Sequence, residues 1–251
     1  MRKSRNLLIC DLSFSELTYK QITNAISSAA DQHKSIIIAP IASHPVALTV
    51  IDPQLRELYQ QIDYLIPDSQ IIYWFLKLFY HTSLPERIYG PTMFLHVVKE
   101  AERSKTRLIL VGNDINRLIN TLKKTYPTLQ VRGIDLHYRP VTDKTIQAVM
   151  EKISGRKGGI IVLGLGSPMQ HKIALSLKKL HMPILTVGAA FDFVSGSKRQ
   201  APLWMQKNGL EWLYRLYHEP RRLWYRYLVL GPFFLLAALA YQAWRGINQH
   251  T

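Results

Sequence analysis

The stretch GIIVLGLGSPMQHKIALSLKKL, residues 159–180, contains the structural unit on which the fold prediction rests. Residues 159–163 form an apolar run that favours a strand, and the glycine-containing turn after them reverses the chain. Residues 169–180 then predict a helix. A buried strand, a turn and a helix in this order are the unit from which parallel sheets covered by helices are built. The stretch therefore predicts an α/β fold.

The same alternation of short apolar runs and helical segments recurs on both sides of this stretch. It predicts a Rossmann-like, mainly parallel sheet with helices on both faces. Residues Ser13–Ser15 are the expected cap of a first helix that ends at Ala30. We expect further strands near residues 7–10, 35–39, 64–66, 107–111, 129–134 and 184–187, and further helices near residues 47–58, 69–80, 92–104 and 142–154 and ending at residue 125.

The alternation stops near residues 195–200, where small and basic residues take over. We therefore expect an α/β domain of residues 1–196 and a basic, aromatic and apolar appendage of residues 197–251. In this C-terminal appendage we expect a pair of helices between residues 202 and 227, and a membrane-associating segment after them.

Residues 227–244 contain no charged side chain and are the expected membrane contact. Their 18 residues would span roughly 27 Å as a helix, short of a hydrocarbon core of about 30 Å, and Gly231-Pro232 is expected to interrupt them. A monotopic or re-entrant insertion is therefore expected, with a single span or a buried core helix as alternatives. The arginines that precede this segment place the globular part on the cytoplasmic side.

The composition gives the chain a large positive charge. With 32 Lys+Arg against 17 Asp+Glu, its formal net charge of +15 favours nucleotide phosphates, nucleic acid or anionic lipid headgroups as partners. No recognisable DNA- or RNA-binding motif is present and nucleic acid would not explain the apolar segment, so we expect no nucleic-acid partner. Cys10 is the only cysteine, which excludes an internal disulfide, and the apolar run 7–10 is too short for a signal peptide.

Three turns that follow predicted strands are candidate ligand sites: residues 67–69, 112–114 and 164–170. The carboxyl ends of parallel strands meet at one edge of a sheet, where backbone N–H groups and helix N-termini can bind anions. Glycines at such turns also serve chain reversal alone, and that alternative stays open. Gly164-x-Gly166 lacks the third glycine of the dinucleotide fingerprint, so neither NAD nor FAD is expected.

Asp68 is the candidate general base, because it follows an apolar strand and opens a helix at this edge. The alternative is an ordinary helix N-cap. The sequence has no Asp-x-Asp motif and no cluster of His, Cys and Asp at metal-ligand spacing, so we expect neither a metal nor a cofactor. His171 and His181 fit surface or packing positions better than catalysis.

The appendage is rich in arginine beside aromatic residues. Arg222 and Arg226 share one helical face by their four-residue spacing, and Pro220 is expected to begin that helix. Guanidinium groups suit diphosphate oxygens, and Trp and Tyr beside them suit the headgroup layer of a membrane. A merely solvated basic face is the alternative.

Four segments resemble the WecG/TagA/CpsF family of bacterial glycosyltransferases, and the resemblance extends along nearly the whole chain. The longest segment, AAFDFVSGSKRQAPLWMQKNGLEWLYRLYHEPRRLWYRY, is residues 189–227. The others are LGLGSPMQ at 163–170, PDS at 67–69 and YPTLQVRGIDLHY at 126–138.

The resemblance implies an inverting, metal-independent hexosyltransferase of cell-surface polysaccharide synthesis. Such an enzyme moves a sugar, N-acetylmannosamine-like or another hexose, from a UDP-sugar to a polyprenyl-diphosphate-linked acceptor at the cytoplasmic face of the bacterial inner membrane. In this chain the catalytic residue would be Asp68. Together with the turns described above, the resemblance places the nucleotide-sugar site at Gly112, Asn113, Gly164, Gly166, Gln170 and Asp192, and the diphosphate or acceptor site at Arg87, Arg215, Arg222 and Arg226.

In and beside these motifs the chain departs from the family pattern at Pro40, Ala42, Ser69, Thr92, Met169, His171 and Gln200. Pro40 and Ala42 stand where the family has T-x-N, and Thr92 stands where it has an acidic residue. These positions lie by the pocket where donor sugar and acceptor should meet, so the sequence leaves both sugars open. It also leaves open a homo-oligomer formed around the appendage. The rival function is a catalytically degenerate, membrane-docked protein that binds UDP or a lipid diphosphate.

Overall fold

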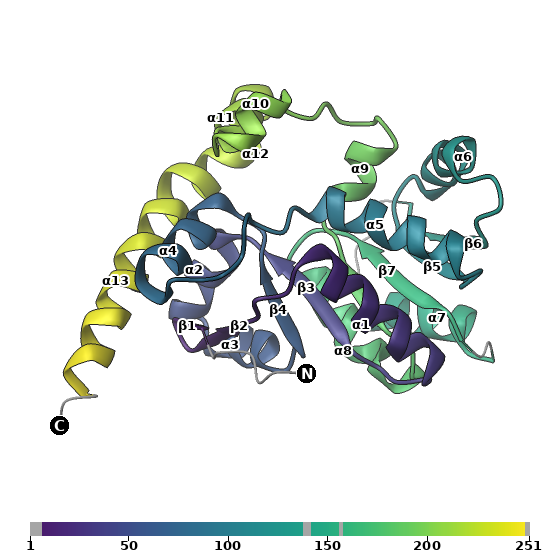
Figure 1. The fold of residues 1–251 in the computed structure, drawn as a ribbon, viewed down its shortest axis with the longest axis horizontal. Helices are drawn as coiled ribbons and strands as arrows, with labels where there is room; N and C mark the ends of the chain where they lie inside the picture. The colour runs from purple at the N-terminus through teal and green to yellow at the C-terminus, as the bar shows by residue number, and fades with distance from the viewer. Residues whose placement is uncertain (1–6, 138–141, 156–157, 249–251) are drawn as a thin grey trace.

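The computed structural model describes residues 7–137, 142–155 and 158–248 (Figure 1). Its centre is one eight-stranded sheet in the order β1-β2-β4-β3-β8-β7-β5-β6. All of these pairings are parallel except that of β1 with β2, so the predicted Rossmann-like α/β fold is confirmed. The strands are β1 (Leu7–Ile9), β2 (Leu12–Phe14), β3 (Ile37–Ile41), β4 (Tyr64–Pro67), β5 (Leu108–Gly112), β6 (Val131–Asp135), β7 (Ile160–Gly164) and β8 (Ile184–Thr186).

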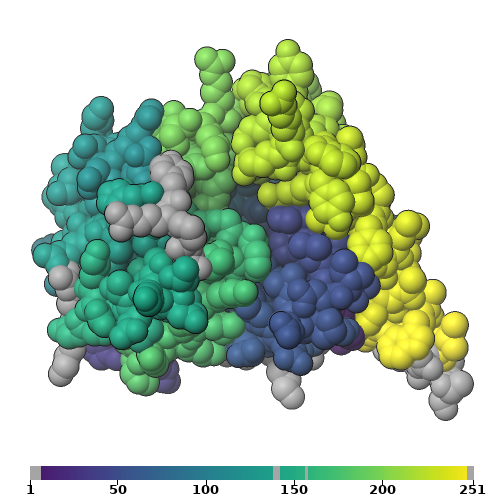
Figure 2. All heavy atoms as spheres, turned by 180° about the vertical axis from the view of Figure 1, so that it is seen from behind, coloured from purple at the N-terminus to yellow at the C-terminus, as the bar shows by residue number. Residues whose placement is uncertain are grey.

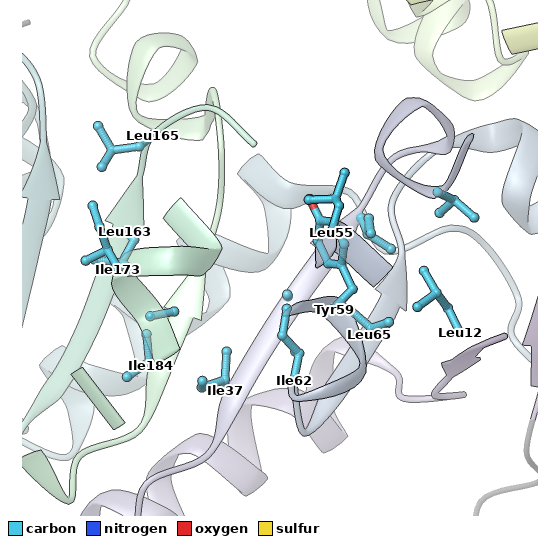
Figure 3. Close-up of a cluster of buried hydrophobic side chains, with 14 of the residues drawn as sticks. Leu12, Ile37, Leu55, Tyr59, Ile62, Leu65, Leu163, Leu165, Ile173 and Ile184 are labelled. Atoms are coloured by element: carbon cyan, nitrogen blue, oxygen red, sulfur yellow. The ribbon is translucent and has the colours of Figure 1, made fainter. Parts of the chain in front are cut away.

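Helices cover both faces of the sheet, as predicted, and each face has its own apolar core. One face packs against α1 (Tyr19–Asp31), α5 (Gly90–Arg103), α6 (Ile115–Thr125) and α9 (Ala190–Val194). The other packs against α2 (Ser43–Ile51), α3 (Pro53–Gln60), α4 (Gln70–Tyr80), α7 (Asp143–Ile153), α8 (Met169–Leu177) and α13 (Leu230–Asn248), and part of this second core is drawn in Figure 3. The central strands β3 and β5 are buried throughout, which their continuous apolar sequences require.

The first helix begins later than predicted. Residues Ser13–Ser15 do not cap it, because Leu12–Phe14 form β2, an antiparallel partner of β1. The turn between the two strands is made by Cys10 and Asp11, both with positive φ, as a tight hairpin requires. The cap of α1 is Thr18, whose side chain accepts from the Gln21 N–H while the Gln21 side chain accepts from the Thr18 N–H.

The appendage is helical and crosses the carboxyl edge of the sheet. It contains α10 (Leu203–Lys207), α11 (Glu211–His218) and α12 (Pro220–Trp224), which Pro220 begins as predicted. The expected interruption at Gly231-Pro232 is wrong, because helix continues from Pro220 to Ile247. A π-helical segment, Tyr225–Val229, ends three residues before Pro232, and its wider turn accommodates a residue that has no N–H to donate.

One side of α13 is part of the core of the α/β domain. Phe234 and Ala238 are fully buried, and the Phe234 ring lies 6.2 Å from that of Phe75 on α4. Polar contacts fix the far end of the helix, where the Tyr241 hydroxyl donates to Asp11 at 2.9 Å and Arg245 donates to the Tyr80 hydroxyl at 2.9 Å. The opposite side of α13 is exposed and apolar. By length and composition alone, helix 220–247 could cross a membrane.

The predicted domain 1–196 and appendage 197–251 include four stretches outside the described residues: 1–6, 138–141, 156–157 and 249–251. Tyr138, the last residue of one family segment, is among them.

Candidate functional site

A pocket of about 680 Å³ lies where the carboxyl ends of the central strands meet the appendage. Figure 2 shows the hollow beneath the yellow-green appendage and above the blue segment that contains α2. The turns after β3, β4, β7 and β8 form its floor, and α11, α12 and the start of α13 form its roof. This is the sheet edge at which parallel α/β folds bind ligands.

Asp68 lines this pocket directly after β4. Ser69, not Asp68, is the N-cap of α4, so the Asp68 carboxylate is not used as a cap. Its Oδ1 atom accepts from the Gly90 N–H at 3.0 Å, and within the described part of the chain no donor contacts Oδ2. Burial raises the pKa of this carboxyl, while Arg87 and the Gly90 N–H act in the opposite direction. A carboxylate with a raised pKa and a free oxygen facing a pocket can accept a proton from a bound hydroxyl.

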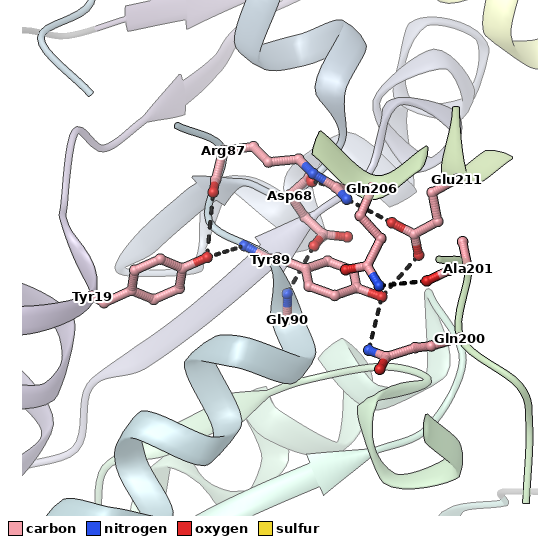
Figure 4. Close-up of polar contacts among 9 residues, drawn as sticks. All are labelled: Tyr19, Asp68, Arg87, Tyr89, Gly90, Gln200, Ala201, Gln206 and Glu211. Atoms are coloured by element: carbon pink, nitrogen blue, oxygen red, sulfur yellow. Dashed lines mark hydrogen bonds and ion pairs between the residues drawn. The ribbon is translucent and has the colours of Figure 1, made fainter. Parts of the chain in front are cut away.

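Arg87 connects the Asp68 loop to the appendage (Figure 4). Its Nη1 atom donates to the Asp68 carbonyl oxygen at 3.1 Å, and its Nη2 atom forms an ion pair with Glu211 at 2.6 Å. The Tyr89 hydroxyl donates to the second Glu211 oxygen at 2.9 Å and accepts from Gln200 at 3.2 Å. The Arg87 and Glu211 side chains are only 13% and 9% exposed. Arg87 was predicted to bind the diphosphate or the acceptor. In the structure two of its nitrogens already donate to protein oxygens, those of Asp68 and Glu211.

Glu211 was not predicted as a site residue. It stands in the GLEW part of the family segment, but its sequence position indicates no more than a helix start with an acidic first turn. Its partners Arg87 and Tyr89 lie more than 120 residues earlier in the chain. No spacing rule connects residues so far apart.

Gln170 joins the turns after β7 and β8. Its Oε1 atom accepts from the Gly188 N–H at 3.0 Å and from the Leu165 N–H at 3.4 Å, and the residue is 3% exposed. Gly164 and Gly166 line the pocket in the first of these turns. Gln170 therefore fixes the relative position of two loops whose backbone faces the pocket.

Gly112 and Gly164 are glycines because Phe191 packs against both. An added Cβ would lie 2.9 Å from the Phe191 ring at Gly112 and 2.1 Å from it at Gly164. Gly112 is not among the residues that line the pocket, whereas its neighbour Asn113 is. Asp192 also lines the pocket, where it forms an ion pair with Lys198 at 2.6 Å.

The appendage contributes Arg215, Arg222 and Arg226 to the pocket, and these three residues were predicted to bind the diphosphate or the acceptor. Arg222 is paired with Glu219 at 2.5 Å. Arg215 lies 5.5 Å above the Phe193 ring, and its buried Nε has no partner among the described residues. Neither Arg215 nor Arg226 forms an ion pair with a carboxylate in the described ranges. These two guanidinium groups are therefore available to an anionic ligand.

Two histidines lie at or beneath the floor of the pocket. His44, which follows β3, lines it and was not predicted, although its place directly after a strand end could have identified it. Burial lowers the pKa of His44 well below its ordinary value, and Arg226 and Arg215 lower it further, so its imidazole is neutral at pH 7. His171 is fully buried against Tyr59, in line with its predicted packing role, and burial lowers its pKa to about 3.

No group of three or more His, Cys, Asp or Glu side chains is gathered like a metal site in residues 7–137, 142–155 and 158–248. Of the predicted site residues, the pocket brings together Asp68, Asn113, Gly164, Gly166, Gln170, Asp192, Arg87, Arg215, Arg222 and Arg226.

Comparison with known proteins identifies the same family as the sequence motifs. The glycosyl transferase WecG/TagA/CpsF family matches residues 7–248. The chain is 26% identical over 210 residues to the N-acetylglucosaminyldiphosphoundecaprenol N-acetyl-beta-D-mannosaminyltransferase of Bacillus subtilis strain 168, covering 82% of this chain and 80% of that protein. It is 26% identical over 237 residues to the protein of the same name from Bacillus spizizenii strain W23, covering 92% of this chain and 89% of that protein.

The family match covers almost every residue that builds the sheet, the pocket and the appendage. Because the match includes the sheet, the pocket and the appendage together, the chain belongs to the WecG/TagA/CpsF family of glycosyl transferases.

Proposed function

We propose that this glycosyltransferase moves a sugar from a UDP-sugar to a polyprenyl-diphosphate-linked saccharide, with inversion and without a metal ion, in cell-surface polysaccharide synthesis. The observation that carries the proposal is the Asp68 carboxylate, which shares one pocket with the guanidinium groups of Arg215 and Arg226. A base and a site for diphosphate charge are the two elements that this reaction requires. The names of both Bacillus relatives give N-acetylglucosaminyldiphosphoundecaprenol as the acceptor and an N-acetyl-beta-D-mannosaminyl group as the sugar that is transferred.

In the proposed reaction the acceptor hydroxyl gives its proton to Asp68 as its oxygen forms a bond to the anomeric carbon of the donor sugar. The bond from that carbon to the UDP oxygen breaks on the opposite side, and UDP leaves with the electron pair. The appendage arginines Arg215 and Arg226 stabilise the negative charge that develops on the diphosphate. Removing one such donor typically costs about 3 kcal/mol of barrier.

The donor sugar of this enzyme is proposed to be N-acetylmannosamine-like or another hexose. At the end of β3, Pro40 and Ala42 line the pocket and offer no polar side-chain atom. Ser43 and His44 line it beside them and provide a hydroxyl and a neutral imidazole. These are the polar side chains that the end of β3 can offer to a donor sugar.

The enzyme is proposed to lie on the cytoplasmic face of the inner membrane with α13 in the plane of the interface. Phe234 and Ala238 face the protein core, whereas Leu236 and Leu239 on the other side are 68% and 46% exposed. For α13 to cross a bilayer on its own, the contacts of Tyr241 and Arg245 with the globular part would have to break. A helix with one protein-facing and one lipid-facing side fits a monotopic protein.

The proposal is tested with Asp68→Asn, which preserves the acceptor oxygen for the Gly90 N–H but cannot take a proton. Release of UDP is measured from a panel of UDP-sugars with a polyprenyl-diphosphate sugar acceptor, together with UDP affinity by calorimetry. The variant should bind UDP within about twofold of the wild type and lose transfer by at least about 10²-fold.

Full turnover by Asp68→Asn would exclude Asp68 as the base. A wild-type protein that binds UDP but releases none from any donor would favour the rival, a degenerate binding protein. The observation that favours this rival is that Pro40 and Ala42, which have no polar side-chain atom, line the pocket.

A further inference from the structure

The pocket has one apolar end, between α4 and α13. Its lining there comes from Ile71 and Trp74 on α4 and from Pro232 and Leu235 on α13. Trp74 is 52% exposed and Leu235 is 37% exposed, although both are large and apolar. The chemistry described above uses Asp68 and the appendage arginines and none of these apolar side chains. The apolar end therefore has no assigned ligand.

Helices α4 and α13 run in the same direction (Figure 1), and each begins at the pocket that Asp68 lines. Phe75, midway along α4, contacts Phe234, near the start of α13, with ring centroids 6.2 Å apart. Further along, Tyr80 accepts from Gln242 and, at 2.9 Å, from Arg245. The contacts between α4 and α13 therefore recur along both helices, at increasing distance from the Asp68 carboxylate.

Exposed apolar side chains continue along both helices beyond the pocket. Leu78 follows Trp74 by four residues and is 69% exposed, and Leu239 follows Leu235 by four residues and is 46% exposed. A spacing of four places each pair on one helical face, about 6 Å apart along the axis. The apolar end of the pocket therefore opens onto an apolar track between α4 and α13.

We propose that this track binds the first isoprenoid units of the lipid-linked acceptor. The proposal rests on the function proposed above, because it concerns the same pocket. A polyprenyl diphosphate carries charge at one end and a hydrocarbon chain at the other. Arg222 lines the same pocket as Arg215 and Arg226, so the appendage can hold the acceptor's diphosphate beside that of UDP. The acceptor's chain would then lie against Trp74, Pro232 and Leu235. This order of charge and apolar surface matches that of the molecule.

The test uses soluble isoprenyl diphosphates, so that membrane binding does not enter. Calorimetry gives the Kd of the full chain for inorganic, geranyl and farnesyl diphosphate. Affinity should rise with chain length, and farnesyl diphosphate should bind at least about tenfold more tightly than inorganic diphosphate. Leu235→Gln should lose about tenfold in affinity for farnesyl diphosphate and keep its affinity for inorganic diphosphate.

The matched control is Leu236→Gln, the next residue on the same helix, which is 68% exposed and does not line the pocket. It should match the wild type with all three ligands. If Leu235→Gln melts early, Leu235→Ala replaces it. In transfer assays, Leu235→Gln should raise KM for an acceptor with a polyprenyl chain and leave KM for a short-alkyl acceptor unchanged.

Equal affinity for the three diphosphates, or equal losses in the two glutamine variants, would overturn the isoprenoid site and leave the proposed function standing. Competition by dihexanoyl phosphatidylglycerol as strong as that by farnesyl diphosphate would assign the track to phospholipid chains instead. If the wild type transfers no sugar but shows the expected binding pattern, the proposed function fails and the isoprenoid site stands.

Discussion

At the scale of single residues, Asp68 is held where burial acts against its charge. The turn from β4 into α4 places the carboxyl in the pocket, and its pKa is raised chiefly by burial. Because the Gly90 N–H and Arg87 stabilise the carboxylate only in part, the folded protein binds a proton at Asp68 more tightly than the unfolded chain does. The group that is proposed to do the chemistry therefore destabilises the fold at neutral pH.

This gives a pH-dependent prediction with a definite sign. A folded-state pKa above the unfolded value makes the Asp68 contribution to stability favourable at acid pH and lost as pH rises through the folded-state pKa. Asp68→Asn should therefore gain in melting temperature relative to the wild type as pH rises from 3.5 to 8, measured by scanning fluorimetry of both proteins. Over the same range, wild-type transfer should rise with an inflection above the ordinary aspartate pKa of about 3.9. A melting-temperature difference that does not change with pH would contradict the raised pKa.

At the scale of elements, the ion pair between Arg87 and Glu211 attaches α11 to the Asp68 loop. Breaking a buried pair by removing one partner typically costs 3 kcal/mol or more, because the other charge stays buried, and for a chain of this size about 3 kcal/mol corresponds to roughly 6–12 °C in melting temperature. Glu211→Gln should therefore lower the melting temperature by about that amount, or release the appendage locally and speed amide exchange in α11.

Glu219→Gln is the matched control. Glu219 pairs with Arg222, and these two side chains are 31% and 54% exposed, respectively. Exposed pairs contribute about 0.5 kcal/mol, so this variant should melt within roughly 2 °C of the wild type. Equal effects of the two substitutions would mean that the Arg87–Glu211 pair does not hold the appendage in place.

The elements also show what sequence could and could not predict. Strands such as β5 and β7 were predictable, because four apolar residues before a glycine turn favour a strand buried on both faces. Strand β2 was missed, because it has three residues and its hairpin uses Cys10 and Asp11 at positive φ in place of the usual glycine. The passage of helix through Pro232 and the pairing of Arg87 with Glu211 depend on tertiary contacts that no local pattern contains.

At the scale of the whole molecule, α13 has two different faces that should be separable by mutation. Leu236→Glu with Ile247→Glu changes only side chains that are 68% exposed and lie outside the track, so it should abolish co-sedimentation with anionic vesicles and leave the melting temperature within about 2 °C. Leu95→Glu is the control, because Leu95 is 36% exposed on α5, which covers the opposite face of the sheet. Unchanged vesicle binding by the double variant would show that this face of α13 is not the membrane contact.

The inward face of α13 also ties folding to translation. The side of the sheet that carries α2 and α4 obtains part of its apolar cover from Phe234 and Ala238, which follow every strand in the chain. Chains are synthesised at about 5–20 residues per second, so the earlier strands wait for many seconds before this cover exists. The nascent protein must therefore keep an unfinished apolar surface shielded until α13 has been made. The fold is therefore completed at the same moment as the exposed apolar face of α13 appears.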